Sequence, residues 1–275
     1  MGWTEPFELD KVQILDNYYL SAQKSDIAFL KKMDTARLLA GFRTTAGIDT
    51  KGVRPYGGWE DSLLGGHCVG HYLTALAQAV KVTGDKELKE KSQTLIAGLE
   101  ECQKKLGTGF LFGAKVEDKE DVEKQFDILE GKKKGETWVP WYNMHKVLAG
   151  LVDTYKYTGN ETALLVAEKL GDWIYERVSK WDLKTNQKVL ETEYGGMNDC
   201  LYELYSYSHN KHHLEAAQKF DEKALFLMAA KGEKNCLDGK HANTQIPKFI
   251  GAIKRYNVLK PVSYTHLTLP TNSRV

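Results

Sequence analysis

Side chains suited to polar recognition gather at four places in the chain, each just before or at the start of an apolar stretch with helical spacing. Sugars need such groups, because their hydroxyls bond charged and amide partners while their apolar face packs on indole or phenol rings. Pro140 begins the clearest stretch, where its fixed φ and missing N–H cost a helix least. The candidate binding residues are Trp59, Glu60, His67, His71, Trp141, His145, Glu193, Asn198, His241 and Gln245.

Simpler roles compete with ligand binding at several of these positions. His67 and His71 lie four residues apart and share a helix face, as a metal pair does, but the intervening Glu of a His-Glu-x-x-His site is absent. Core histidines satisfied by neighbouring loops are the simpler interpretation, and we predict no metal ligand in this chain. Glu191 and Glu193 alternate, so one of them is expected to face solvent. His145 is our first choice for a ligand contact.

Paired helices are predicted to position these groups. In each pair the first helix is apolar and rich in small residues, and the second carries more Lys and Glu, so inner and outer layers are expected. The predicted pairs are 63–83 with 86–105, 145–157 with 161–180, and 196–207 with 211–227; a first helix covers about 12–33, and 245–256 begins a fourth pair. Long, individual loops precede the inner helices, which favours an all-α toroid of helical hairpins over a regular binding solenoid.

Composition excludes several classes of protein. The 38 basic and 37 acidic residues nearly balance, which argues against nucleic acid as the main partner. No apolar run reaches the length of a membrane span and no signal peptide is visible, so we expect a cytoplasmic protein. The four cysteines are widely scattered, which predicts reduced thiols rather than a disulfide framework or a zinc knuckle.

The pattern changes near residue 261. Residues 261–275 lack helical periodicity and contain neither Glu nor Lys, although the repeat calls for a charged outer helix there. We therefore predict one domain over residues 1–260 and a non-native read-through tail over residues 261–275.

Five motifs resemble glycoside hydrolase family 127, the non-reducing-end β-L-arabinofuranosidases and their relatives. They are Gly-Gly-Trp-Glu at 57–60, Gly-His-Cys-Val-Gly-His-Tyr-Leu at 66–73, Val-Pro-Trp-Tyr-Asn-Met-His-Lys at 139–146, Glu-Tyr-Gly-Gly-Met-Asn at 193–198 and His-Ala-Asn-Thr-Gln-Ile-Pro-Lys at 241–248. The resemblance implies an (α/α)6 barrel and retaining hydrolysis of terminal β-L-arabinofuranosides in plant-type glycans. It also implies a cysteine nucleophile held in a zinc site of three cysteines and a glutamate, with a second glutamate as acid/base, and contact between His145 and sugar hydroxyls.

The family's zinc and nucleophile segments, Glu-x-Cys and later Cys-Cys, lie downstream in its members, and the cysteines of this chain match none of those positions. We therefore assign no catalytic residue and no zinc ligand here, and expect an inactive fragment of about four hairpins. Its uncovered apolar edge favours association with other copies. The alternative is a non-catalytic helical-repeat module that binds a glycan or a protein.

Overall fold

The computed structural model describes residues 7–116, 118–233 and 236–259, and every regular element in these ranges is a helix. Two short 3₁₀ turns, η1 (Leu9–Lys11) and η2 (Gly58–Asp61), accompany the α-helices. The α-helices are α1 (Asn17–Lys32), α2 (Thr35–Thr45), α3 (His67–Thr83), α4 (Lys86–Leu106), α5 (Lys124–Leu129), α6 (Pro140–Thr158), α7 (Glu161–Val178), α8 (Leu183–Glu191), α9 (Met197–Ser208), α10 (Lys211–Lys219), α11 (Lys223–Ala230) and α12 (Ala242–Leu259). The all-α prediction is confirmed for these residues.

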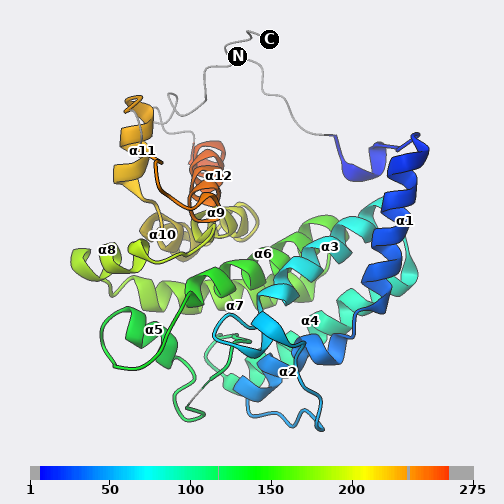
Figure 1. Cartoon of the computed structure of the whole chain (residues 1–275), viewed down its shortest axis with the longest axis horizontal. Coiled ribbons are helices and arrows are strands. Elements are labelled where there is room, and N and C mark those ends of the chain that lie inside the picture. The colour runs from blue at the N-terminus through cyan, green and yellow to red at the C-terminus, as the bar shows by residue number, and fades with distance from the viewer. Residues whose placement is uncertain (1–6, 117, 234–235, 260–275) are drawn as a thin grey trace.

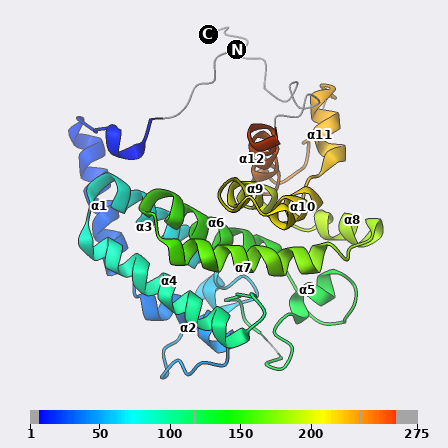
Figure 2. The same cartoon turned by 180° about the vertical axis from the view of Figure 1, so that it is seen from behind.

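The helices form two layers. In the inner layer α1 packs on α3, α3 on α6, α6 on α9 and α9 on α12; in the outer layer α2 packs on α4, α4 on α7 and α7 on α10. Figure 1 shows α3 and α6 side by side, and Figure 2, from behind, shows α4 and α7 in front of them. The predicted alternation of inner and outer helices is therefore present, as an arc of helical hairpins.

Glycines bring the two central inner helices unusually close together. A Cβ atom on Gly70 of α3 would lie 1.9 Å from the carbonyl oxygen of Lys146, and one on Gly150 of α6 would lie 2.5 Å from the carbonyl oxygen of Gly70. Only glycine fits such a backbone approach. The contact sets the start of α3 beside the start of α6, where most of the candidate residues lie.

Several predicted boundaries were wrong. The first helix begins at Asn17 rather than near Val12, because the Asp16 carboxylate caps it by accepting hydrogen bonds from the N–H groups of Tyr18 and Tyr19. Helix α2 was not predicted at all, and α5 and α8 lie within segments interpreted as loops. The outer helix predicted over 211–227 is broken into α10 and α11, since the fully buried Phe220 enters the core at the break.

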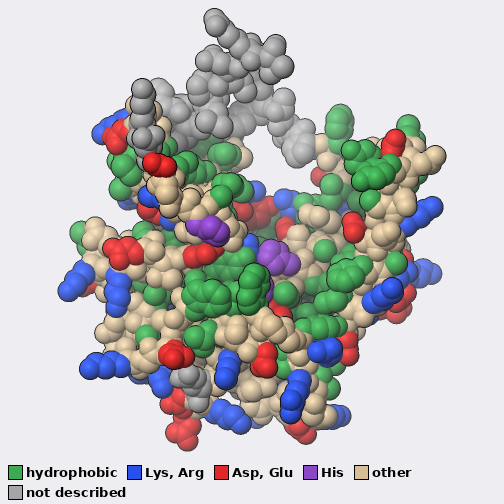
Figure 3. All heavy atoms as spheres, viewed as in Figure 1, with side chains coloured by type: hydrophobic (Ala, Val, Ile, Leu, Met, Phe, Trp, Pro, Cys, Tyr) green, Lys and Arg blue, Asp and Glu red, His purple; other side chains and the backbone are tan. Residues whose placement is uncertain are grey.

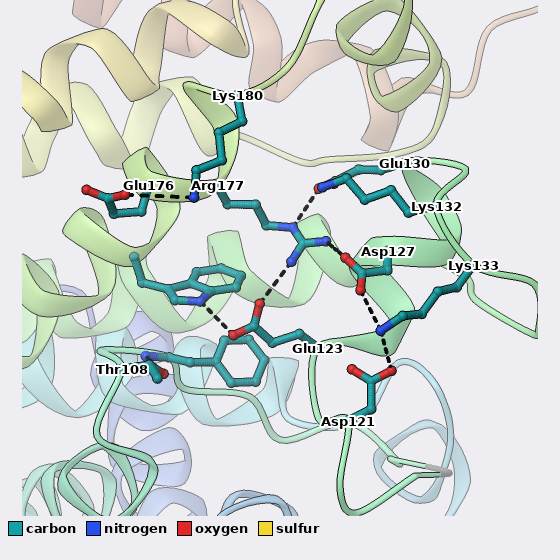
Figure 4. Close-up of polar contacts among 12 residues, drawn as sticks. Thr108, Asp121, Glu123, Asp127, Glu130, Lys132, Lys133, Glu176, Arg177 and Lys180 are labelled. Atoms are coloured by element: carbon teal, nitrogen blue, oxygen red, sulfur yellow. Dashed lines mark hydrogen bonds and ion pairs between the residues drawn. The ribbon is translucent and has the colours of Figure 1, made fainter.

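A cluster of charged side chains fastens the segment between α4 and α6 to the outer helix α7 (Figure 4). We call it the Arg177 cluster. The Arg177 guanidinium donates to Glu130 at 2.6 Å, Glu123 at 2.9 Å and Asp127 at 2.5 Å, while Trp173 also donates to Glu123 at 3.0 Å. These bonds hold the chain just before it enters α6.

The last inner helix of the described chain has an uncovered side. Ile246, Ile250 and Ile253 of α12 are 58%, 48% and 52% exposed, at spacings that place them on one helix face. This is the apolar edge that the sequence predicted. The tail predicted over 261–275 lies outside the described residues. In the described ranges, no helix combines the length and the apolar character that crossing a bilayer requires.

Candidate functional site

The starts of α3, α6, α9 and α12 meet at one end of the inner layer, which we call the mouth. Two contacts join the starts of α3 and α6: the rings of His67 and Tyr142 have centroids 6.2 Å apart, and Asn143 Nδ2 donates to the Leu63 carbonyl at 3.2 Å. The Gly196 N–H donates to His145 at 3.0 Å and joins α9 to α6. Asn243 donates to Glu193 at 3.1 Å and joins α12 to the segment before α9. Figure 3 shows histidine side chains beside apolar ones near the middle of this face. The predicted convergence of the four entrances is therefore correct.

His145 is held at the mouth as a neutral ring. Its Nδ1 accepts the Gly196 N–H, so the proton of the neutral ring lies on Nε2. Burial, with the nearby charges of Lys146 and His71, keeps the pKa of His145 well below its usual value. Within the described parts of the chain, Nε2 has no hydrogen-bond partner. The ring therefore carries a neutral N–H donor that has no partner in the described protein.

Two glycines make room for this imidazole. Gly195 has a φ of +59°, and a Cβ there would lie 2.5 Å from His145 Nδ1; a Cβ on Gly196 would lie 3.0 Å from Nε2. The Gly-Gly pair does more than permit entry into a helix, because a side chain at either position would displace the ring. The imidazole position is thus set from α9 as well as from α6.

Glu60 links the 3₁₀ turn η2 to the start of α3. Its carboxylate accepts the N–H groups of Gly66 at 2.9 Å and Cys68 at 3.2 Å, and it pairs with His67 Nδ1 at 2.8 Å. Burial acts to raise the pKa of Glu60, but the bonds from His67, Gly66 and Cys68 outweigh it and lower the pKa. His67 is also bonded to the Leu64 carbonyl at 2.9 Å, as expected for a histidine satisfied by a loop.

Trp59 and His71 flank His67 and are open to solvent. Trp59 is 67% exposed, with its ring 6.4 Å from that of His67, and it lines a cavity of about 250 Å³ together with Glu60 and His67. The exposed His71 ring stands edge-on to His67 at 6.2 Å. An exposed indole beside imidazoles provides the stacking surface and donors that a sugar needs.

Lys146 is a residue of the mouth that the sequence analysis missed. Its ammonium lies 4.7 Å from the centroid of the Tyr142 ring, and burial lowers its pKa. Among the described residues no carboxylate lies within ion-pair distance of it. The available signal was a lysine inside an apolar inner helix, next to the histidine already chosen.

Trp141 requires a correction. It is fully buried and packs edge-to-face on Phe126, Trp181 and Phe220, at centroid distances of 4.9, 5.5 and 5.1 Å. A helix turns by about 100° per residue, so Trp141 and its neighbour Tyr142 face different sides. Trp141 belongs to the core, and the ring at the mouth is Tyr142.

The remaining candidates divide between buried and exposed positions. Asn198 is fully buried and donates to the Lys248 carbonyl at 3.2 Å, which ties α9 to α12. Gln245 is 9% exposed, and its Oε1 is buried without a hydrogen-bond partner. His241 is exposed beside Thr244, and Glu193 is half-buried under Asn243. Asn198 is therefore a packing residue, whereas the other three stay near the mouth.

A second group of ionisable side chains lies deeper between the inner helices, around a cavity of about 150 Å³. It contains Asp153 and Lys156 of α6, Asp199 and Glu203 of α9, and Lys254 of α12. Burial raises the pKa of Asp199 to about 6. A larger cavity of about 850 Å³ lies against α8, α10 and α11, and none of the candidate residues lines it.

The zinc site that the resemblance implies does not fit these residues. Glu100-Glu101-Cys102 has the Glu-x-Cys spacing, but Cys102 is fully buried in the outer helix α4, and adjacent cysteines occur nowhere in the sequence. Cys200 is buried as well, with its thiol directed at the Met197 carbonyl. No set of three cysteines gathers in the described parts of the chain, so no catalytic step is assigned to them.

The comparisons agree with the fold and the motifs. The family model for the β-L-arabinofuranosidase GH127 catalytic domain matches residues 11–268. The structure resembles the crystal structure of Ara127N-Se, a GH127 β-L-arabinofuranosidase from Geobacillus stearothermophilus T6, with a TM-score of 0.57 and 15% identity over 93% of this chain and 43% of that one. The chain thus spans less than half of that protein, and no curated protein matches it. By the family match, this chain belongs to the GH127 β-L-arabinofuranosidase catalytic-domain family.

Proposed function

We propose that this chain forms the part of a GH127 glycosidase that binds a terminal β-L-arabinofuranosyl residue of a plant-type glycan. The retaining hydrolysis belongs to a longer protein that supplies the zinc-held cysteine and the glutamate acid/base. Family membership supports a carbohydrate substrate. Experiment must test the choice of sugar, and also the assignment of sugar binding to this chain and of hydrolysis to a longer protein.

The observation that carries the proposal is the hydrogen bond from Gly196 N–H to His145 Nδ1 at 3.0 Å. It makes Nε2–H the free end of the ring, at the point where the inner helices meet. The residue as a whole is 7% exposed, and a donor with so little access to water gains more from a ligand hydroxyl than a fully hydrated donor does. His145 therefore donates to a sugar oxygen, while Trp59 and Tyr142 offer ring surfaces and Glu193 and His241 lie at the edge.

The test measures binding of methyl β-L-arabinofuranoside to the purified chain by calorimetry or ligand-observed NMR, with methyl α-L-arabinofuranoside as the comparison. We expect His145→Ala to weaken binding of the β anomer about tenfold, the equivalent of one hydrogen bond. The matched control is His209→Asn. His209 ends α9 away from the mouth, at a φ of 53° that Asn also adopts.

Equal affinity for both anomers, or an unchanged affinity in His145→Ala, would reject the sugar site. Preference for a protein or a long glycan without anomeric selectivity would support the helical-repeat binding module instead. A separate assay covers catalysis. We expect the chain alone to leave an aryl β-L-arabinofuranoside intact, and measurable hydrolysis would show that it carries its own catalytic residues.

A further inference from the structure

We propose that Glu60, His67 and Cys68 form a binding site for a borderline-soft divalent cation such as Zn²⁺. One ligand atom from each residue, a carboxylate oxygen, a ring nitrogen and the thiol sulfur, lies within 4.8 Å of the other two. A carboxylate, an imidazole and a thiolate are all ligands that zinc takes. The site differs from the three-cysteine site that the family resemblance implies, because it holds a single cysteine and lies at the start of α3.

The hydrogen bonds around His67 decide which nitrogen is available. Its Nδ1 faces two acceptors, the Glu60 carboxylate at 2.8 Å and the Leu64 carbonyl at 2.9 Å, and so carries the proton. Nε2 therefore keeps its lone pair, and it lies 3.7 Å from Cys68 Sγ. The Leu64 carbonyl by itself can hold this tautomer, as a backbone carbonyl often does for a metal-binding histidine, and this leaves the Glu60 carboxylate as a ligand for the ion.

The thiol supplies the charge that the site needs. Cys68 is partly exposed, and an ordinary thiol carries its proton at neutral pH. When a cation binds, the S–H bond breaks, the sulfur–metal bond forms and one proton leaves to solvent. A thiolate and the Glu60 carboxylate then balance the two positive charges of the ion.

The site is accessible and has room for a further ligand. The three side chains lie against the cavity of about 250 Å³ whose other walls are Met33, Tyr56, Gly57 and Trp59. A water molecule there would complete four-coordination. Of the other cysteines, Cys102 and Cys200 are buried, and in the described parts of the chain no other group of three potential ligands is found.

The experiment uses the whole chain, stripped of metal with a chelator and titrated with Co²⁺ and then with Zn²⁺. We expect a thiolate-to-cobalt charge-transfer band that saturates at one equivalent, release of about one proton per ion, and loss of the band on adding Zn²⁺. Cys68→Ser should abolish the band and weaken Zn²⁺ binding at least about tenfold, as should His67→Gln. Cys236→Ser, which alters the other partly exposed thiol, should change neither.

Cys68→Ser is nearly isosteric and keeps the N–H that Glu60 accepts, so a thermal melt should show an intact fold. This separates loss of the ligand from loss of structure. A wild-type chain that gives no charge-transfer band, or a band that persists in Cys68→Ser or disappears in Cys236→Ser, would overturn the proposal. The result is independent of the sugar-binding test, because it reads metal ligation alone.

Discussion

The Arg177 cluster and the mouth both contain ionisable side chains removed from water, but they use them differently. Around Arg177, three carboxylates surround one guanidinium (Figure 4), and Lys132 and Lys133 pair with the second oxygens of Glu130 and Asp127. At the mouth, His145 keeps a free N–H and Lys146 has a ring in place of a carboxylate. Charged groups that have partners within the protein hold a loop in position, while polar groups that lack such partners remain available to a ligand.

Two carboxyl groups show a similar division in their pKa directions: Asp127 in the Arg177 cluster and Asp199 in the separate cavity between α6, α9 and α12. Burial acts to raise the pKa of Asp127, but Lys133 and Arg177 outweigh it and lower the pKa. Between the inner helices, Asp199 has no hydrogen bond or ion pair to its carboxylate among the described residues, and burial raises its pKa to about 6. The comparison teaches that partners, rather than burial alone, decide whether a charge stabilises this fold.

Removing the guanidinium should have the largest effect on stability. Arg177→Met takes one cation from three carboxylates and leaves Glu130, whose side chain is fully buried, with only the half-exposed Lys132 as a charge partner. We expect the free energy of unfolding to fall by about 3–5 kcal/mol, the usual cost of breaking a buried pair, as measured by urea denaturation. The control is Lys180→Met, since Lys180 and Glu176 lie 3.9 Å apart and are each 70% exposed. Similar midpoints for both variants would show that the Arg177 cluster is not needed to hold the loop.

Replacing Gly195, which lies against the His145 ring, should have the second-largest effect on stability. Gly195→Ala forces a Cβ to 2.5 Å from the ring at a φ of +59°. We expect a loss of about 2–4 kcal/mol of unfolding free energy, from left-handed backbone and overpacking together, and weaker binding of the β-arabinofuranoside. Gly159→Ala is the matched control, because its φ is +69° with no atom within 4 Å. Gly159→Ala should lose only the unfolding free energy that comes from the left-handed backbone, and it should leave binding unchanged. Equal losses of unfolding free energy in the two variants would show that Gly195 has no steric role.

The smallest expected effect on stability comes from replacing Asp199, and this replacement should stabilise the fold. The folded pKa of about 6 lies above the ordinary 3.8, so between these values the folded state keeps a proton that the unfolded chain has lost. The wild-type unfolding free energy therefore falls as pH rises through this window. Asp199→Asn should be more stable than wild type by about 1–2 kcal/mol above pH 6, with the gain vanishing near pH 4, as followed by denaturation across pH.

Asp127→Asn should change the unfolding free energy in the opposite direction. The lowered pKa of Asp127 means that its carboxylate stabilises the fold above the ordinary value of 3.8 and loses this effect as pH falls below it. We expect Asp127→Asn to be less stable than wild type at neutral pH. A destabilised Asp199→Asn, or a stabilised Asp127→Asn, would contradict the division drawn between these two carboxyl groups.

The helical class, the inner and outer layers, and the shared mouth were predictable from sequence, because all three rest on periodicity and on local composition. Pro140 marks the start of α6, and glycines mark the ends of α3, α4 and α6. Helix α2 and the break at Phe220 were not predictable in this way. Their positions depend on packing against distant segments, which a local pattern does not contain.

The sequence by itself determined which residues carry chemistry and roughly where along the chain they lie. Only the tertiary structure decided that Trp141 enters the core while Tyr142 faces the mouth, and that Gly195 and Gly196 exist to seat an imidazole from another helix. The tautomer of His145 and the unpaired state of Lys146 were likewise decided by groups far away in sequence. Hydrogen bonding and burial depend on neighbours in space, and the order of residues specifies these only through the complete fold.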